Sequence, residues 1–173
     1  MIKTVIKRSG VPEDFAPAKL NIWGKWASAK LHERLDWSGV VLEAVKTLPE
    51  VVTTQELQQK LIDVCISRKT WPYNLMAGRL YAKKKKKEIH GYTLPKVKDL
   101  FKKLHKLKLM KKLDYTFEEW DEIEKIIDHT RDFEMAHFQI KYIINKYTIY
   151  NKVTKEFYET PQYTYMRMAL ALA

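Results

Sequence analysis

Apolar residues recur every three or four positions through most of this chain, and this helical period constrains the fold more than any other feature of the sequence. Helices are predicted to begin at Pro17, after Asp36 and at the capping box of residues 53–56. A fourth helix is expected over residues 73–90 and is ended by Gly91. The pattern therefore indicates a mainly α fold.

A short β-hairpin is expected ahead of these helices. Residues 2–7 and 11–15 flank Ser9-Gly10, and glycine readily adopts the positive φ that hairpin turns require. The hairpin and the four helices together predict one module over residues 1–91.

Residues 92–173 are predicted to form a second, helical part with a hairpin of its own. The expected elements are helices over residues 94–110, 116–128 and 131–147, a hairpin over 147–160 and a helix that begins at Thr160-Pro161. The last helix is apolar and reaches Ala173 without a capping residue. We interpret it as a truncated helix that continues in a longer chain.

The positive charge of the chain is concentrated in one segment. Thirteen lysines lie between Lys83 and Lys112 against only Glu88 and Asp99, and this excess accounts for the whole formal net charge of +11. Lysines and leucines are interleaved there as on an amphipathic helix. Stacking aromatic residues are nearly absent, so the segment favours a solvated face or an acidic protein partner over nucleic acid.

Composition excludes several classes of protein. No apolar stretch approaches the ~20 residues that span a bilayer, and the N-terminus lacks the apolar segment of a signal peptide. We therefore expect a cytoplasmic protein that does not contact membranes. The single cysteine, Cys65, lies on the apolar face of the helix that begins at residues 53–56. It is expected in the core, and it supports neither a disulfide framework nor a metal cluster.

A group of potential metal ligands lies near residue 130. Asp128, His129, Asp132 and Glu134 all come from one helix boundary, where converging ligands are hard to arrange. We favour helix capping and an ion pair between an aspartate and Arg131 over a metal site. No serine or cysteine has a partner histidine by motif, so we predict no catalytic residue in this chain.

The strongest candidate for a binding site is a set of three cations near the hairpin turn. Lys7 and Arg8 lie at the turn, and Lys19 lies one turn into the following helix, whose N-terminus offers amide donors to an anion. Arginine and lysine are a common pair around polyphosphates. From spacing alone, three solvated surface cations are the alternative interpretation.

The stretch VIKRSGVPEDFAPAKL (residues 5–20) resembles the opening of the ATP-cone, a nucleotide-binding regulatory domain with a β-hairpin and four helices. The matching residues are Lys7, Arg8, Gly10, Glu13, Phe15 and Lys19. Residues 53–61 and 73–91 resemble later elements of the same domain, although Lys83–Lys86 depart from its more apolar pattern.

The resemblance to the ATP-cone implies a role for each matching residue. Phosphates would contact Lys7, Arg8, Lys19 and Lys87, the base would contact Phe15 and Leu20, and Glu13, Thr54 and Gln58 would make polar contacts. ATP or dATP would be the effector, accompanied by Mg²⁺ because a triphosphate carries dense charge.

The second part of the chain resembles the segment that follows the cone in class I ribonucleotide reductase large subunits. The resemblance is carried by DHTRD at residues 128–132, KY at 146–147, YET at 158–160 and Tyr165. It implies partnership with the rest of the large subunit and with a radical-bearing small subunit, in an oligomer. ATP would favour an active assembly and dATP an inactive one. Reduction of a ribose needs several cysteines, so this chain, with Cys65 alone, is expected to lack turnover of its own.

Two other functions remain open at this point. The chain would serve as a stand-alone or degenerate nucleotide-sensing module that acts by docking to another protein. Alternatively, it would be a nucleic-acid-binding regulator that uses the basic segment 83–112. The second alternative is less favoured because such regulators carry a cysteine-rich zinc ribbon, and this chain has one cysteine.

Overall fold

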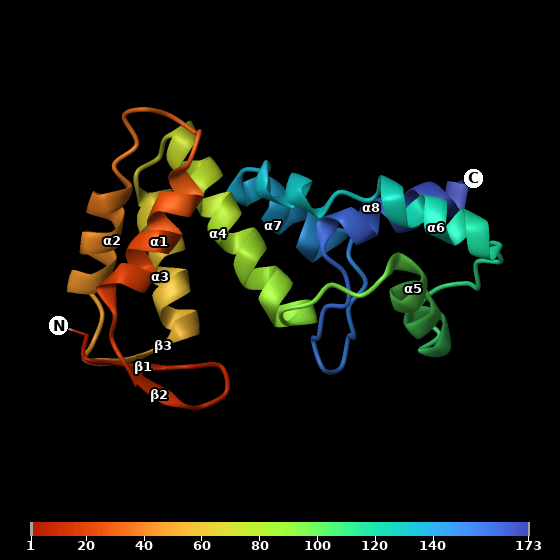
Figure 1. The fold of residues 1–173 in the computed structure, drawn as a ribbon, viewed down its shortest axis with the longest axis horizontal. Helices are drawn as coiled ribbons and strands as arrows, with labels where there is room; N and C mark the ends of the chain where they lie inside the picture. The colour runs from red at the N-terminus through yellow and green to blue at the C-terminus, as the bar shows by residue number, and fades with distance from the viewer. Residues whose placement is uncertain (1, 173) are drawn as a thin grey trace. The chain divides into compact units, whose positions relative to one another are not determined.

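The computed structural model describes residues 2–172 and confirms the prediction of a mainly α protein (Figure 1). The described residues pack as two compact units. Unit 1 contains the residues up to Lys84 together with Glu134–Gln139, and unit 2 contains Lys85–Phe133 and the residues from Ile140 onward. No helix in the described range is long and apolar enough to cross a membrane.

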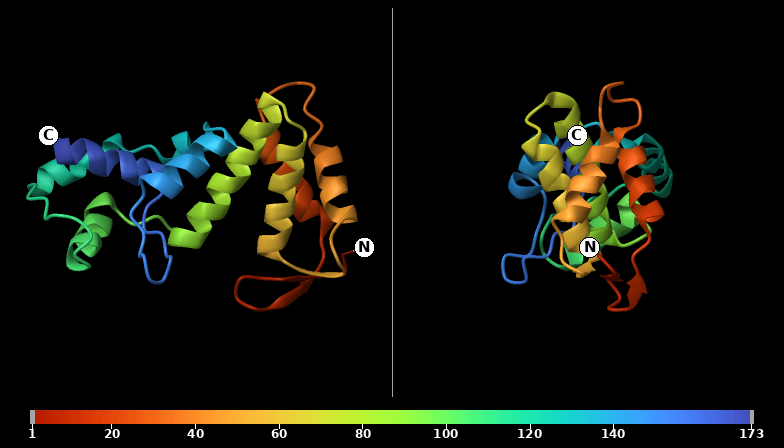
Figure 2. Two further views of the ribbon diagram at one scale, coloured as in Figure 1. Left: turned by 180° about the vertical axis from the view of Figure 1, so that it is seen from behind. Right: turned by 90° about the vertical axis from the view of Figure 1, so that its left-hand side faces the viewer.

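Unit 1 is a helical bundle with a small sheet at one end (Figure 2). Its elements are β1 (Thr4–Ile6), β2 (Pro12–Asp14), α1 (Pro17–Ser28), α2 (Trp37–Lys46), β3 (Val51–Thr53), α3 (Thr54–Ser67) and the first part of α4 (Trp71–His90). Its core contains fully buried Val40, Leu61, Ile62 and Met76, and Cys65 is buried beside them as predicted.

The predicted hairpin is confirmed, but the sheet has a third strand. β1 pairs antiparallel with β2, with Thr4 opposite Asp14. Gly10 supplies the turn with a φ of +81°. β1 also pairs in parallel with β3, with Thr4 opposite Val51. The sequence analysis missed β3 because a three-residue strand shows no period and its parallel partner lies far away in the chain.

The helix starts in unit 1 follow the local signals in the sequence. Pro17 is in the first turn of α1, and the Asp36 carboxylate accepts the Gly39 N–H at 2.8 Å at the start of α2. The Thr53 and Glu56 side chains form both halves of the capping box of α3. These contacts satisfy amide donors that the first helical turn otherwise leaves unpaired.

Unit 2 is also helical. Its elements are the last part of α4, α5 (Val97–Lys106), α6 (Phe117–Ile126), the 3₁₀ helix η1 (His129–Phe133), most of α7 (His137–Lys146) and α8 (Pro161–Leu172). Its buried core comprises Val97, Leu100, Phe101, Leu104, Trp120, Ile123 and Tyr163. Leu107, predicted on the buried face, is 46% exposed because α5 ends at Lys106.

One prediction for unit 2 was wrong, and another was confirmed only in part. The helix expected over residues 131–147 is divided into η1 and α7. The hairpin expected over 147–160 is reduced to a single antiparallel bridge between Tyr150 and Phe157. Side-chain oxygens accept hydrogen bonds from backbone N–H groups that would otherwise pair between two strands. Asn151 Oδ1 accepts the Val153 N–H, and Glu159 accepts the Ile149 N–H. Such side-chain contacts compete with regular strand pairing.

Candidate functional site

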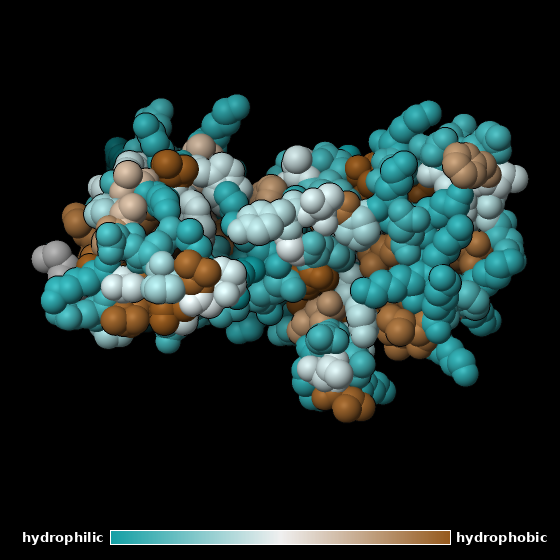
Figure 3. Space-filling model, turned by 60° about the horizontal axis from the view of Figure 1, so that its bottom comes forward, coloured by the Kyte–Doolittle hydropathy of each residue, from teal (hydrophilic) through white to brown (hydrophobic). Residues whose placement is uncertain are grey.

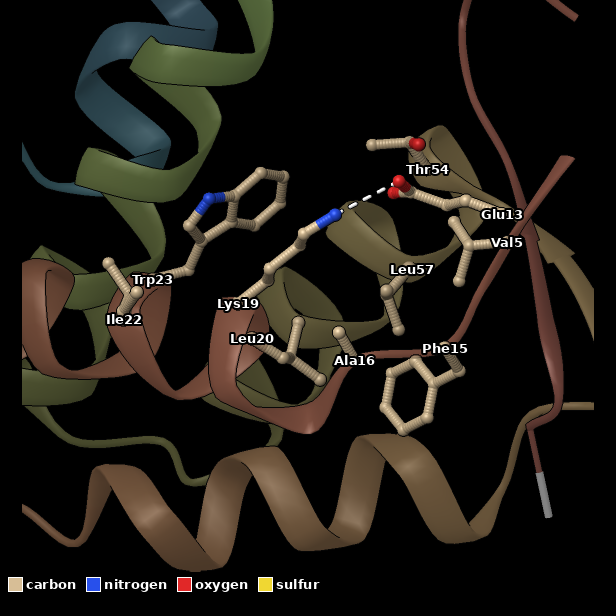
Figure 4. Close-up of a pocket in the computed structure, with 10 residues that line it drawn as sticks. All are labelled: Val5, Glu13, Phe15, Ala16, Lys19, Leu20, Ile22, Trp23, Thr54 and Leu57. Atoms are coloured by element: carbon tan, nitrogen blue, oxygen red, sulfur yellow. Dashed lines mark hydrogen bonds and ion pairs between the residues drawn. The ribbon is translucent and has the colours of Figure 1, made fainter. Parts of the chain in front are cut away.

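A cavity of about 240 Å³ lies in unit 1 where the hairpin meets the first turns of α1 and α3 (Figure 4). The lining side chains are Val5, Glu13, Phe15, Ala16, Lys19, Leu20, Ile22, Trp23, Thr54 and Leu57. Most of this wall is apolar, and its few polar groups come from three different elements. The structure thus brings five of the nine predicted site residues to one cavity, namely Glu13, Phe15, Lys19, Leu20 and Thr54.

The start of α1 borders this cavity. The N-cap residue, Ala16, makes no side-chain capping bond, and the first turn of α1 contains no acidic residue. Ala16 and Lys19 both line the cavity, Pro17 has no N–H, and the Lys19 N–H donates to the Ala16 carbonyl at 3.0 Å. The partial positive charge of the helix N-terminus, more than free amides, suits this turn to an anion.

The Glu13 carboxylate forms ion pairs with two of the predicted site residues, Lys7 and Lys19. One Glu13 oxygen, Oε2, lies 2.8 Å from Lys7 Nζ and 2.9 Å from Lys19 Nζ (Figure 4 shows the Lys19 contact). Hydrogen bonds from Lys7 and then Lys19 hold the pKa of Glu13 below its usual value. The two lysine side chains remain 48% and 66% exposed, so both ammonium groups are accessible to a ligand from solvent.

Arg8, Gln58 and Thr54 link the hairpin to α3. Arg8 Nη2 donates to Gln58 Oε1 at 3.1 Å, and Gln58 is only 2% exposed. Thr54 Oγ1 donates to the Ile6 carbonyl at 3.3 Å, which ties the first residue of α3 to β1. Arg8 and Gln58 do not line the cavity, so the structure pairs these two predicted residues with each other at its side.

Lys87 is placed differently from the other predicted residues. It belongs to unit 2, where its Nζ lies 5.1 Å from the centroid of the Tyr92 ring. Within unit 1, the α4 lysine that contacts α3 is Lys84, whose Nζ donates to Gln59 Oε1 at 2.6 Å. The phosphate contact expected of Lys87 stays a prediction.

Trp23 is the residue of the cavity that the sequence analysis missed. It follows Lys19 by one helical turn and lines the cavity beside it, whereas its place in the apolar period with Leu20 and Ala27 predicts a core residue. A large aromatic residue four positions after a cation on one helix face is the signal that would have identified it. Its position adds an aromatic wall next to the charged groups.

The residues near position 130 have structural contacts. Asp128 Oδ1 accepts the Thr130 N–H at 2.9 Å and caps η1, and Arg131 Nε lies 3.9 Å from Asp128 Oδ2. Among the described residues no cluster of three or more histidine, cysteine or acidic side chains is arranged to hold a metal ion. Asp132 is buried, and burial raises its pKa to about 7.

The Cys65 thiol is inert by position. It is fully buried in α3, and burial raises its pKa to about 12. A thiol is nucleophilic as the thiolate, so this residue is a core side chain without a chemical role.

Comparison with known proteins shows homologues of this chain. No family model matches the chain. The chain is 30% identical over 175 residues to the ribonucleoside-diphosphate reductase subunit alpha of Haemophilus influenzae and 29% identical over 177 residues to the ribonucleoside-diphosphate reductase 1 subunit alpha of Escherichia coli. It is 28% identical over 180 residues to the subunit alpha of Enterobacteria phage T4. Each alignment covers 97% of this chain and 23% of the relative.

The chain is therefore homologous to ribonucleotide reductases. More specifically, it corresponds to the N-terminal part of the large, or alpha, subunit, and it spans about a quarter of the length of the curated relatives it matches.

Proposed function

We propose that this chain is the N-terminal regulatory part of a ribonucleoside-diphosphate reductase large subunit, which serves deoxyribonucleotide synthesis, and that the unit 1 cavity binds ATP or dATP. The observation that carries this proposal is the pair of exposed ammonium groups, Lys7 and Lys19, held on one carboxylate beside an apolar, aromatic cavity. The homology to reductase alpha subunits supports the same interpretation.

The cavity suggests how a nucleotide would be held. Phe15, Leu20 and Trp23 provide the apolar surface for a purine base, and aromatic faces are well suited to stacking. The phosphates would lie toward Lys7 and Lys19, where the N-terminus of α1 adds its partial positive charge. Glu13 orients the two lysines before the ligand arrives, so less side-chain entropy is lost on binding.

Arg8 would exchange partners on binding. In the structure its guanidinium is occupied by Gln58 Oε1, a neutral acceptor. A phosphate oxygen is a stronger acceptor for a guanidinium than a neutral amide is. Transfer of Arg8 to the phosphates would free the buried Gln58 amide to make a polar contact with the nucleotide or with Thr54.

Mg²⁺ would enter with the nucleotide and be held mainly by phosphate oxygens and water. The cavity offers a single carboxylate, Glu13, which already bridges two ammonium groups. Magnesium ions commonly keep several waters and bind through substrate phosphates, so this donor set fits a nucleotide-borne ion.

Regulation requires that ATP and dATP stabilise different assemblies. A ligand shifts an equilibrium only by its difference in affinity for the two states. We propose that the states are assemblies of the large subunit with a radical-bearing small subunit, active with ATP and inactive with dATP. Lys87 would complete the phosphate contacts in this scheme.

Calorimetric titration of this chain with Mg-ATP and Mg-dATP tests the nucleotide site. Lys7→Ala/Arg8→Ala should weaken binding at least about a hundredfold, since each charge-assisted contact contributes about 1.5–3 kcal/mol. The control is Lys102→Ala/Lys106→Ala, which removes the same charge from exposed positions of α5. Its affinity should stay within about twofold of the parent. Absence of binding at millimolar nucleotide would refute the site and favour an interaction module.

A further inference from the structure

A second cavity, of about 340 Å³, lies within unit 2 and has no part in the nucleotide site proposed above. Its lining residues are Lys85, Glu88, Ile89, Lys103, Lys155, Glu156, Phe157 and Tyr158. We propose that this cavity is a second anion site, which binds a small phosphate-bearing ligand.

Three elements of unit 2 bring the lysines of this cavity together. Lys85 lies on the last turns of α4, Lys103 lies on α5, and Lys155 lies on the loop between α7 and α8. That loop is preformed, because the Tyr150–Phe157 bridge closes it. The Lys155 N–H donates to the Asn151 carbonyl at 2.8 Å within it.

The backbone at Lys155 fixes where the loop places this lysine. Its φ is +61°, a left-handed conformation that Lys30, Lys69 and Lys108 share without lining either cavity. The conformation is therefore not itself a sign of a ligand, and the evidence for the site is the position of Lys155 at the cavity wall.

Three lysines and two glutamates, Glu88 and Glu156, line the cavity, so the lining carries a small positive excess. Lys85 Nζ is paired with Glu88 Oε2 at 2.8 Å. In the described part of the chain, neither Lys103 nor Lys155 has a carboxylate within ion-pair distance. Lys103 Nζ instead lies 5.4 Å from the centroid of the Tyr158 ring, a contact that an incoming anion can strengthen or replace.

Phosphate is the anionic group that we assign to this wall. Lysine binds phosphate as a compact point charge, and no arginine lines the cavity to offer the planar, bidentate contact that a carboxylate or a phosphate can also use. The volume lies at the lower end of small-molecule sites, and Ile89 and Phe157 can contact the carbon body of the ligand.

The lining favours a small ligand over a docked protein. Five of its eight side chains are charged, whereas protein-docking surfaces usually contain a contiguous apolar centre. Hydrophilic side chains likewise predominate on the face of the molecule seen in Figure 3, where several hydrophobic patches are also exposed. A cavity with lysines from three elements is the form expected for a compact anion.

Chemical-shift mapping of the ¹⁵N-labelled chain with sodium tripolyphosphate, at about 0.15 M salt to screen general attraction, tests the proposal. The titration is done in the Lys7→Ala/Arg8→Ala background, so that binding in unit 1 is weakened. Amides of residues 85–89, 103 and 155–158 should shift and saturate together. Signals of residues 5–23 report any remaining binding in unit 1 separately, and the calorimetric titration of the parent chain with nucleotide tests the unit 1 site, so failure of one site is distinguished from failure of the other.

Matched variants decide whether the cavity or the overall charge binds the probe. Lys103→Gln/Lys155→Gln should weaken tripolyphosphate binding at least about tenfold, whereas Lys102→Gln/Lys106→Gln should leave it within about twofold. Equal weakening by both pairs, or no shifts at millimolar probe, would overturn the proposal. Citrate binding as tight as tripolyphosphate binding would overturn the choice of phosphate.

Discussion

Each unit of the molecule places a glutamate against cationic side chains, but the two glutamates lie in opposite surroundings. Glu13 in unit 1 is shared by two lysines that are largely exposed to solvent. Glu159 in unit 2 is completely buried, and its oxygens accept from Arg167 Nε at 2.7 Å and from the Ile149 N–H at 2.9 Å. The first group is available to a ligand, whereas the second is occupied by its own fold.

The residues that carry the two sequence resemblances therefore have different roles. The ATP-cone resemblance includes Glu13, which lines an open cavity. The reductase resemblance in the second part includes Asp132 and Glu159, which are buried. Buried ionic groups whose oxygens are all hydrogen-bonded, as those of Glu159 are, hold neighbouring elements in a defined arrangement. We infer that the second resemblance is carried mainly by residues that position helices and loops.

The largest effect is expected from removal of the buried carboxylate. Glu159→Ala would leave the Ile149 N–H without its acceptor and Arg167 with the Tyr147 carbonyl alone, without its buried counter-charge. Breaking a buried ion pair from one side costs about 3–5 kcal/mol, so we expect a loss of this size in the free energy of unfolding. Urea denaturation followed by tryptophan fluorescence measures it.

Two other glutamates serve as controls for this prediction. Glu156→Ala, on an exposed loop position, should change the free energy of unfolding by less than about 1 kcal/mol. Glu13→Ala should be similarly mild for stability but should weaken nucleotide binding, because Lys7 and Lys19 lose their common anchor. A Glu13→Ala loss as large as that of Glu159→Ala would show that the two glutamates do not differ in role.

A second test concerns how unit 1 is completed by residues 134–139. A Cβ added at Gly78 on α4 would collide with the Met135 carbonyl and lie 3.0 Å from the His137 backbone nitrogen. Backbone cannot move as a flexible side chain can, so Gly78→Ala should cost about 1–3 kcal/mol even though alanine favours a helix. Thermal and urea unfolding measure the change.

Gly24→Ala provides the graded control. A Cβ there would meet only side-chain atoms, of Trp37 and Val41, at 2.9 Å. Side chains can adjust, so this variant should lose less stability than Gly78→Ala. The opposite order would mean that residues 134–139 do not pack against α4 as unit 1 requires.

The third test uses pH, because unit 2 buries titratable groups that the unit 1 cavity lacks. His90 packs edge-on to Tyr163 with ring centroids 5.2 Å apart, and its Nε2 has no hydrogen-bond partner. Burial, reinforced by the charge of His129, lowers the pKa of His90 to about 4. The unfolded chain takes up this proton near pH 6.5, so stability from His90 is lost as the pH falls from about 6.5 to 4.

His90→Phe should therefore reduce the acid sensitivity of the free energy of unfolding. After allowance for residual solvent access, we expect a difference of about 1–2 kcal/mol between parent and variant on going from pH 7.5 to pH 4.5. Asp132, with a pKa raised to about 7, has the opposite dependence, but it is present in both proteins and cancels. Urea midpoints at the two pH values measure the slope. Equal slopes would contradict the prediction.

Local signals predicted the helices well, and long-range contacts account for what was missed. Caps at Asp36 and Thr53 and the stop at Gly91 depend on neighbouring residues, so the sequence reveals them directly. β3 depends on a partner about 47 positions away, and the predicted hairpin near residue 150 was replaced because Glu159 takes a backbone N–H.

In the candidate site, too, local groupings could be predicted from the sequence and long-range contacts could not. The grouping of Lys7, Glu13 and Lys19 follows from a hairpin turn and the start of a helix, which are both local. The pairing of Arg8 with the buried Gln58 joins residues 50 positions apart and is not visible in any spacing. Trp23 was assigned to the core because periodicity marks a face as apolar without showing whether that face is covered.

The smallest expected effect comes from the two capping boxes, one in each unit. In both, the threonine hydroxyl accepts a hydrogen bond from the backbone N–H of the third helical residue. Glu56 donates to Thr53 at 3.1 Å, and Glu119 donates to Thr116 at 3.2 Å. A cap is a local interaction, so Thr53→Ala and Thr116→Ala should each cost about 1 kcal/mol of unfolding free energy in urea titrations, despite the different surroundings of the two helices. A difference of more than about 1 kcal/mol between the variants would show that packing around one helix, rather than the cap itself, sets the cost. In that case the two units would differ in the packing around single helix turns as well as in the surroundings of their glutamates.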